Sequence, residues 1–380
     1  MTGQFALTDD QLAIQDMARK FTADNITPFA AEWDEKHHFP RDVIQKTGEL
    51  GFGAIYVSEA SGGIALGRLE AALIMEAMAY GCPATSAYVS IHNMASWMID
   101  TYGSDELKAR YLPKLVTMEH IASYALTEPG SGSDAAALKT SARIDGDHYV
   151  LNGTKQFISG GGFNDIYVVM VRTGEHKAKG ITCLVIEKDT PGLSFGTPEN
   201  KLGWNASPTA QLIFEDCRVP VANRVGDEGE GFRFAMAGLD GGRLNIGACS
   251  LGGAQRCLDE AVAYTKDRQQ FGQSIADFQN TQFMLADMAT ELEAARALLY
   301  LAAAKVTEGA PDKTRFSAMA KRLATDTGSK VVNDALQLFG GYGYLKDYPI
   351  ERFWRDLRVH SILEGTNQVM RMIVGRDMLR

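Results

Sequence analysis

The pattern of hydrophobic and polar residues divides the chain into three zones. In the first, residues 1–120, apolar positions recur at helical spacing. Thr8 can cap a helix that begins at Asp9, because an acidic first turn suits a helix N-terminus. Two further helices are expected over 66–80 and 84–100. This zone therefore predicts an N-terminal α-helical domain.

The second zone, residues 121–232, changes to short runs rich in β-branched residues. Segments 166–171 and 181–186 predict strands, and so does 148–151. Strands at this spacing without helices between them predict an antiparallel barrel or sandwich. Two turn signals flank the segment 148–151, namely Asp145–Asp147 and Asn152–Gly153.

The third zone, residues 233–380, returns to long helical patterns. One apolar stripe predicts a helix near 276–308, long enough for a bundle. Its companions are expected near 230–265 and 312–339. We therefore predict an α+β multidomain chain with boundaries after residues 120 and 232.

Composition and charge exclude several classes of protein. The 380 residues carry 38 Lys and Arg against 47 Asp and Glu, a net charge of −9. This acidic balance argues against a nucleic-acid binder, and no apolar run of 18 residues predicts a membrane span. Without a signal or transit pattern at the N-terminus, we expect a cytoplasmic, bacterial protein or the mature form of a mitochondrial matrix protein.

The cysteines and histidines argue against a metal site. The five cysteines form no C-x-x-C pair, and no Cys/His group has zinc spacing. We expect free thiols in a reducing compartment and no metal. The cysteines are Cys82, Cys183, Cys217, Cys249 and Cys257.

Two glycine motifs match known fingerprints but lack their context. Gly130-x-Gly132-x-x-Ala135 would need a helix and a parallel strand to bind a dinucleotide, and a hairpin follows instead. The wider string Leu126–Asp134 fits either a backbone that a flavin approaches closely or a solvated loop. The segment Gly192–Gly196 matches a nucleophile elbow but sits among strand-like residues, so a hairpin turn is the better interpretation.

Three segments in the C-terminal half combine glycines with candidate chemistry. The glycines of Gln337–Tyr344 indicate a helix cap that a ligand can also approach. Arg268–Gly272 fits a charged helix end or a clamp for a diphosphate. In Ile362–Gln368, Glu364 lies beside apolar residues and is either a perturbed carboxylate or a surface residue before a helix capped by Thr366 or Asn367.

Taken in order, five of these strings resemble the acyl-CoA dehydrogenase family over essentially the whole chain. They are Leu126–Asp134, Lys155–Ser159, Arg268–Gly272, Gln337–Gly341 and Glu364–Gln368.

The resemblance implies an N-terminal helical domain, a central antiparallel β-barrel and a C-terminal four-helix bundle, assembled as a homotetramer. It also implies FAD as cofactor, acyl-CoA as substrate and an electron-transfer flavoprotein as electron acceptor. The family's flavin contacts map onto Tyr124, Leu126, Thr127, Gly132, Ser133, Phe157, Ile158, Ser159, Thr366, Asn367 and Gln368. The adenine and pyrophosphate contacts, largely from a neighbouring subunit, map onto Arg268, Phe271, Phe278, Gln279, Gln337, Gly340 and Gly341. The substrate contacts map onto Ser133, Asp240, Gly241, Gly242, Arg243, Gly365 and Arg376.

The implied reaction is the α,β-dehydrogenation of a thioester, in which Glu364 removes the α-proton and the flavin accepts the β-hydride. One branch of the family places its base just before an arginine, but Gly242 precedes Arg243 here, so that position has no carboxylate. The family commonly has aromatic residues where this chain has Leu363, and Trp where it has Phe157.

The chain is similar to the branch that converts isobutyryl-CoA to methacrylyl-CoA in valine catabolism. The alternatives are a straight-chain or 2-methylbutyryl-CoA enzyme, a flavin monooxygenase on the same scaffold and a non-catalytic flavoprotein.

Overall fold

The computed structural model describes residues 7–379 and begins with the predicted capped helix. The Thr8 side chain accepts a hydrogen bond from Gln11 N, and the Gln11 side chain accepts one from Thr8 N. These two bonds form a capping box, which satisfies donors that the first helical turn leaves free. The N-terminal helices are α1 (Asp9–Asn25), α2 (Ala30–Glu35), α3 (Arg41–Lys46), α4 (Arg68–Ala79), α5 (Pro83–Tyr102) and α6 (Asp105–Val116).

The middle of the chain forms one eight-stranded sheet. Its hydrogen-bonded order is β6-β7-β3-β2-β4-β5-β8, with β1 paired to β4. The strands are β1 (Ala122–Ala125), β2 (Ser141–Asp145), β3 (His148–Ser159), β4 (Ile166–Arg172), β5 (Ile181–Glu187), β6 (Leu193–Phe195), β7 (Thr209–Pro220) and β8 (Arg224–Val225).

Two features of this sheet differ from the expected antiparallel barrel. Among residues 7–379 no pairing joins the end strands β6 and β8, so the hydrogen bonding leaves the sheet open. The pairs β1–β4 and β2–β4 are parallel, whereas the other pairs are antiparallel. Parallel neighbours need long connections, which local sequence patterns do not reveal.

One of the two predicted turns beside 148–151 is also wrong. Gly146 and Asp147 connect β2 to β3, as expected. Asn152 and Gly153 instead lie inside β3, where its register with β7 shifts between Leu151 and Gly153. Gly153 has φ +143°, and an added Cβ would approach the Thr140 Cα to 2.7 Å, so the glycine serves a β-bulge.

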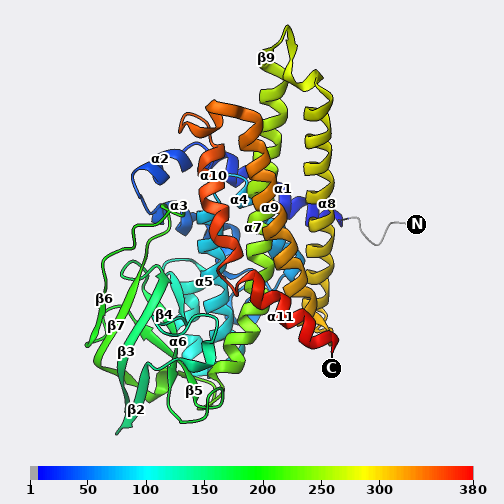
Figure 1. Ribbon diagram of the computed structural model, residues 1–380. Helices are drawn as coiled ribbons and strands as arrows, with labels where there is room; N and C mark the ends of the chain where they lie inside the picture. The colour runs from blue at the N-terminus through cyan, green and yellow to red at the C-terminus, as the bar shows by residue number, and fades with distance from the viewer. Residues whose placement is uncertain (1–6, 380) are drawn as a thin grey trace.

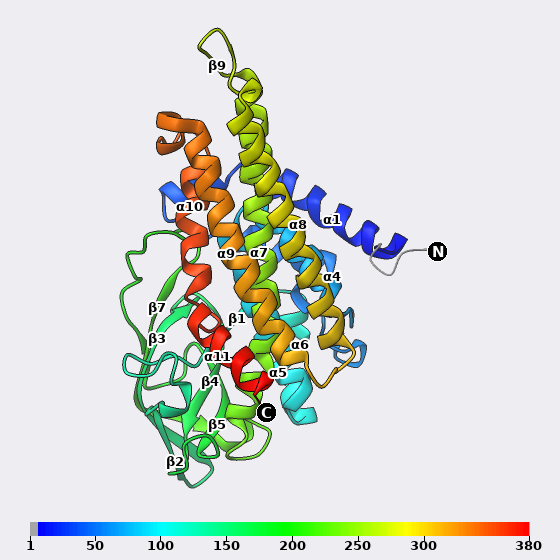
Figure 2. The ribbon, with the colours of Figure 1, turned by 45° about the vertical axis from the view of Figure 1, so that its right-hand side comes forward.

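The C-terminal part is built on three long helices that lie side by side (Figures 1 and 2). They are α7 (Gly231–Asp267), α8 (Gln279–Thr307) and α9 (Lys313–Phe339), close to the predicted ranges. The hairpin of β9 (Gln269–Gln270) and β10 (Gln273–Ser274) forms the tip between α7 and α8.

Two short helices lie along α9 where the fourth member of a bundle is expected. They are α10 (Ile350–Arg358) and α11 (Asn367–Met378), and both contact α9. The chain between them, residues 359–366, breaks this fourth helical segment beside the sheet (Figure 1). Glu364 lies in that break.

Packing joins the three parts. One core cluster combines α4 and α5 with α7, α8 and α9, and a second lies between α5 and the sheet. Alternate residues of β4 enter the second and third clusters, so both faces of this strand are buried. All five cysteines are free and buried, and no described helix is long and apolar enough to cross a membrane.

Candidate active site

Glu364 occupies a backbone turn between α10 and α11 that constrains its side chain. Its φ is +54° and that of Gly365 is +87°, so two consecutive residues adopt the left-handed conformation. This conformation is uncommon for a residue with a Cβ and costs of the order of 1 kcal/mol. The residue is partly exposed, but Oε2 of its carboxylate is buried and has no hydrogen-bond partner among residues 7–379.

The carboxylate of Glu364 lies directly against helix α7 at Gly242. A Cβ placed on Gly242 would lie 2.6 Å from Glu364 Oε2 and 3.0 Å from Cδ. A real Cβ essentially never lies within 3.0 Å of a non-bonded heavy atom, so a larger residue at 242 would displace the carboxylate. Gly242, the residue before Arg243, therefore supplies no carboxylate of its own. Its missing side chain provides the space that the Glu364 carboxylate occupies.

Burial and two cations act in opposite directions on the Glu364 carboxyl. Burial is the larger effect and raises its pKa to about 7, while Arg243 and Lys321 favour the ionised form. Arg243 is itself paired, because its Nη1 lies 2.7 Å from Asp240 Oδ1. Its Nε donates to the Glu364 carbonyl oxygen at 3.4 Å, which links α7 to the turn.

Two tyrosines face the same carboxylate. The charge of Glu364 contributes to the raised pKa of Tyr56 and Tyr124, although burial is the larger cause in both. The Tyr124 hydroxyl comes from β1 and has no hydrogen-bond partner in the described structure. The carboxylate thus lies where α7, the sheet and the α10–α11 turn meet.

The sheet brings two of the predicted flavin strings together. The Lys155 ammonium, fully buried, donates to Leu126 O at 3.1 Å and to Glu128 Oε1 at 2.8 Å. Gln156 N donates to Thr127 O at 2.8 Å. These bonds hold Leu126–Asp134 beside Lys155–Ser159, although nearly thirty residues separate them in the chain.

The surface formed by these strings is open where a flat ligand needs access. Phe157 is 64 % exposed and has φ +58°, whereas the next residue, Ile158, is buried. Leu126 is 8 % exposed and Thr127 is partly buried. A Cβ on Gly132 would meet nothing within 4 Å, and Ser133 is exposed beside it. An aromatic side chain held outward by a constrained backbone suits stacking against a ring.

A second group of predicted residues gathers at the tip of the helical bundle. Arg268 ends α7 and shares a cavity of about 460 Å³ with Gly340 and Gly341. Its guanidinium lies over the Tyr342 ring at 5.6 Å. Phe271 projects from the hairpin, 94 % exposed with φ +53°. Phe278 packs on Phe271 with ring centroids 6.2 Å apart, while Gln279 and Gln337 lie exposed nearby on α8 and α9.

This tip is remote from Glu364. Arg243 and Arg268 are separated by 25 residues on or at the end of α7. At 1.5 Å per residue this places them about 37 Å apart along the helix axis. The structure therefore brings the predicted cofactor residues together as two separate groups.

The remaining predicted residues lie at the start of α11 and along α7. Thr366 caps α11 by accepting from Val369 N, as one of the two expected caps. Asn367 is buried, whereas Gln368 and Arg376 are exposed.

The other predicted residues lie on α7 and in the sheet. The carboxylate of Asp240 pairs with Arg243 and accepts a hydrogen bond from the Thr314 hydroxyl at 2.6 Å. Ser159 accepts from the Ser123 hydroxyl at 2.6 Å, and a Cβ on Gly241 would meet Arg68 at 2.3 Å rather than Glu364.

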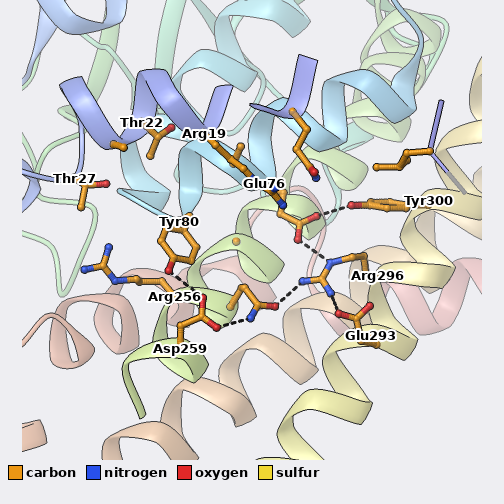
Figure 3. Close-up of a pocket in the computed structure, with 16 residues that line it drawn as sticks. Arg19, Thr22, Thr27, Glu76, Tyr80, Arg256, Asp259, Glu293, Arg296 and Tyr300 are labelled. Atoms are coloured by element: carbon orange, nitrogen blue, oxygen red, sulfur yellow. Dashed lines mark hydrogen bonds and ion pairs between the residues drawn. The ribbon is translucent and has the colours of Figure 1, made fainter. Parts of the chain in front are cut away.

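A separate cavity of about 830 Å³ lies between α1, α4, α7 and α8 (Figure 3). Its polar groups largely satisfy one another. Glu76 accepts from Arg296 at 2.8 Å and from Tyr300 at 3.1 Å, and Asp259 accepts from Tyr80 at 2.9 Å. This network explains the charges around the cavity as structural ion pairs.

Residue patterns alone did not single out three buried charged residues near the site. Lys155 and Glu128 form a buried ion pair, and Lys321 donates to Gly365 O at 2.8 Å. Glu128 and Lys155 lie within the strings Leu126–Asp134 and Lys155–Ser159 but were not singled out there, whereas Lys321 lies in a helical stretch without a motif. Only the contacts over long sequence separations reveal them.

Comparisons with known proteins agree with this architecture over the full chain. Residues 8–119, 123–217 and 229–379 match the N-terminal, middle and C-terminal domains of acyl-CoA dehydrogenase. The chain belongs to the acyl-CoA dehydrogenase family. It is therefore a flavin-dependent oxidoreductase with FAD as cofactor.

Individual family members are similar over almost the whole length. The mitochondrial isobutyryl-CoA dehydrogenase of Dictyostelium discoideum is 58 % identical over 98 % of this chain and 90 % of its own. Butyryl-CoA dehydrogenase from Megasphaera elsdenii superposes with a TM-score of 0.97 at 38 % identity, covering both chains completely. A chain in the structure of the electron transferring flavoprotein of Acidaminococcus fermentans has the same TM-score at 44 % identity and the same coverage.

Proposed function

We propose that this chain catalyses the FAD-dependent α,β-dehydrogenation of isobutyryl-CoA to methacrylyl-CoA, a step of valine breakdown. Glu364 is the base that removes the α-proton. The observation that carries the proposal is the Glu364 carboxylate, which has a buried, partnerless oxygen against Gly242. A buried acceptor without a donor costs free energy and is rare in a core that serves only stability. The unsatisfied oxygen therefore suits a carboxylate whose function is to accept a proton.

The surroundings of Glu364 suit this task chemically. A general base works best when its pKa lies near the operating pH, and burial raises the pKa of Glu364 to about 7. The left-handed turn at Glu364 and Gly365 fixes where the carboxylate points. Because a base must be positioned before its pKa matters, the turn and Gly242 together define its place.

A hydrogen-bond donor is available for the thioester oxygen, which gains negative charge as the α-proton leaves. The backbone N–H of Glu364 has no partner within residues 7–379, unlike those of Ile362 and Leu363, which donate to Val359 O. A preorganised backbone donor stabilises developing charge without reorganising during the reaction. Glu364 would then act through its side chain and its main chain.

The bound FAD would supply the acceptor for the β-hydride. Tyr124, Leu126, Thr127 and the strand end Phe157–Ser159 would hold its isoalloxazine ring, with Gly132 and Ser133 beside it. The exposed Phe157 ring, the open space at Gly132 and the partnerless Tyr124 hydroxyl fit such a planar group. Thr366–Gln368 would close over the cofactor.

The distance between the two groups of cofactor residues supports a site shared between subunits. The tip residues would bind the adenine and pyrophosphate end of a neighbouring subunit's FAD, since about 37 Å of α7 separates Arg268 from Arg243. Phe271 is 94 % exposed at that tip, which favours a contact with another copy. These features support the homotetramer expected for the family.

The acyl preference rests on similarity rather than on the pocket. The relative at 58 % identity is an isobutyryl-CoA dehydrogenase, whereas the butyryl-CoA enzyme is 38 % identical. A straight-chain or 2-methylbutyryl substrate is the alternative, because one methylene changes binding in an apolar pocket by only about 1–3 kcal/mol. Asp240, Gly241, Arg243 and Arg376 would contact the CoA thioester, and an electron-transfer flavoprotein would reoxidise the enzyme.

Anaerobic titration of the purified protein with acyl-CoA tests the proposal. Isobutyryl-CoA should bleach the flavin absorbance faster than butyryl-, 2-methylbutyryl- or isovaleryl-CoA. Glu364→Gln should retain FAD and lose bleaching by about 10²–10⁴-fold, the usual contribution of a general base. Faster bleaching by a different acyl-CoA would show that the substrate is not isobutyryl-CoA. A wild-type bleaching rate in Glu364→Gln would show that Glu364 is not the base.

A further inference from the structure

The turn that carries Glu364 needs an anchor because its backbone is unfavourable by itself. Glu364 and Gly365 are consecutive left-handed residues, and the helices on either side end and begin within a few residues. Conformations of this kind persist only where the surrounding structure fixes them. Contacts with neighbouring elements must therefore hold the turn at Glu364 and Gly365 in place.

Lys321 of α9 makes a shorter hydrogen bond to the backbone of the turn than Arg243 does. Its ammonium is fully buried and donates to Gly365 O at 2.8 Å and to Asn367 Oδ1 at 2.9 Å. The Asn367 amide in turn donates to Thr325 Oγ1 at 2.9 Å and to Asp326 Oδ1 at 2.7 Å. One face of α9 therefore holds the Gly365 carbonyl before Thr366 and the Asn367 side chain after it.

Lys321 also brings a positive charge that no nearby ion pair neutralises. In the described structure no carboxylate lies within ion-pair distance of its ammonium, which is bonded to neutral oxygens. Burial lowers the pKa of Lys321 to about 8, while the charge of Glu364 favours its protonated form. Lys321 is therefore a cation at neutral pH.

The other charged and titratable groups near Glu364 are accounted for. Arg243 is paired with Asp240, and Asp326 lies beyond Asn367. Tyr56 and Tyr124 face the carboxylate as neutral phenols, because burial raises the pKa of both. His360, next to Lys321, is neutral as well, since burial lowers its pKa to about 3.

We infer that Lys321 is a positioning residue for Glu364: its ammonium clamps the turn through the Gly365 carbonyl, and its charge favours the carboxylate over the carboxylic acid. The inference rests on the proposed role of Glu364 as base. Lys321 does not touch the reacting atoms. It acts through the backbone and through its charge.

Two substitutions separate these effects. Lys321→Met removes both the donors and the charge, whereas Lys321→Gln removes the charge but can still donate to the Gly365 carbonyl. Lys330→Met is the matched control, because Lys330 lies on the same helix, is half-exposed and pairs with Glu291 on α8. A purely structural role for Lys321 would lower stability without moving the titration of Glu364.

The first measurement is the pH dependence of anaerobic flavin bleaching by isobutyryl-CoA. In both Lys321 variants the rising limb should move to higher pH by about one unit, as expected from losing a nearby cation at an effective dielectric of about 20. The rate at the optimum should fall at least tenfold in Lys321→Met and less in Lys321→Gln. Lys330→Met should match the wild type.

The second measurement does not use turnover. The carboxyl C=O infrared band that is missing in Glu364→Gln should titrate near pH 7 in the wild type and at higher pH in both Lys321 variants. An unmoved midpoint in Lys321→Gln overturns the inference, even if Lys321→Met fails to fold. A wild-type flavin that no acyl-CoA bleaches would instead contradict the proposed function, while this titration still tests the role of Lys321.

Discussion

Gly242 and Glu364 touch across the interface between α7 and the α10–α11 turn, so closely that a methyl group on Gly242 would lie 2.6 Å from Glu364 Oε2. The two residues are 122 positions apart in the sequence. A glycine is required here for space, since Gly242 lies within a regular helix. The place of the carboxylate therefore depends on a residue that has no side chain.

Gly242→Ala should separate activity from stability. The methyl group must displace the carboxylate, and a shift of about 1 Å at a reacting group can cost about 10²-fold in rate. Alanine is also the better helix former by about 1 kcal/mol, which offsets part of any strain. We expect folded protein with FAD bound and a flavin-bleaching rate reduced by about that factor.

A neighbouring glycine on α7 provides the control. A Cβ on Gly238 would lie 3.3–3.5 Å from the flexible side chains of Met94 and Met98. Gly238→Ala should therefore leave the bleaching rate nearly unchanged. Equal rates in the two alanine variants would show that the Gly242 contact does not position the carboxylate.

Glu364→Gln should stabilise the protein at alkaline pH. The pKa of Glu364 rises from about 4.5 in the unfolded chain to about 7 in the folded one, mainly through burial. Ionisation therefore opposes folding, beginning above pH 4.5 and reaching its full cost above pH 7. The cost is at most about 3 kcal/mol, because each unit of pKa corresponds to 1.36 kcal/mol.

Thermal unfolding at two pH values measures this effect. The Tm of Glu364→Gln should exceed that of the wild type at pH 8, and the difference should be several times smaller at pH 5. Asp356, whose pKa burial also raises to about 7, is present in both proteins and cancels in the comparison. A difference that does not change with pH would contradict the burial argument.

The buried ion pair of Lys155 and Glu128 should be needed for both stability and FAD binding. The pair joins the two flavin strings, and Glu128 also accepts from the backbone N–H groups of Lys139 and Thr140. Removing one partner of a buried pair costs about 3–5 kcal/mol, because the other charge stays buried alone. Lys155→Met should therefore lower the Tm and the FAD content after gel filtration.

A double variant distinguishes the effect of leaving the Glu128 charge unpaired from the effect of losing the Lys155 side chain. In Lys155→Met with Glu128→Gln, no charge is left buried, and glutamine can still accept from one backbone N–H. Part of the lost stability should return. If the loss of stability in the double variant equals the sum of the losses in the two single variants, Lys155 and Glu128 do not act as a pair.

Sequence patterns predicted what local residues determine. The capping box at Thr8 and the ranges of α7, α8 and α9 follow from short-range signals, and the structure confirms them to within a few residues. The same signals were wrong at Asn152–Gly153, where pairing with β7 outweighs a turn preference. The order and openness of the sheet depend on contacts that no local pattern contains.

The candidate site shows the same division. The strings around Glu364 and Phe157 were visible in the sequence, and so was the missing carboxylate at Gly242. Lys321 was not, because a lysine between helical residues resembles a surface charge until its bond to Gly365 O, 44 positions away, is seen. The domain boundaries after residues 120 and 232 stay predictions.

Arg268→Ala should weaken FAD retention without disturbing the Glu364 region. Arg268 is exposed at the tip, shares the cavity with Gly340 and Gly341, and lies about 37 Å along α7 from Arg243. If a neighbouring subunit's FAD uses this tip, loss of the guanidinium removes a charge-assisted bond to its diphosphate. We expect a lower flavin-to-protein ratio after gel filtration, with an unchanged Tm at saturating FAD.

Arg256→Ala is the matched control, because Arg256 lies on the same helix and pairs with Glu260 rather than with the tip cavity. Its FAD content should equal that of the wild type. Mixing subunits sharpens the test, since Arg268→Ala affects the neighbour's site and Glu364→Gln affects its own. If the tip binds a neighbouring subunit's FAD, a mixed assembly contains some sites in which Glu364 of an Arg268→Ala subunit is completed by the unchanged Arg268 of a Glu364→Gln subunit. Such assemblies should recover activity. Loss of FAD from only the Arg268→Ala subunits would show that each chain binds its own cofactor.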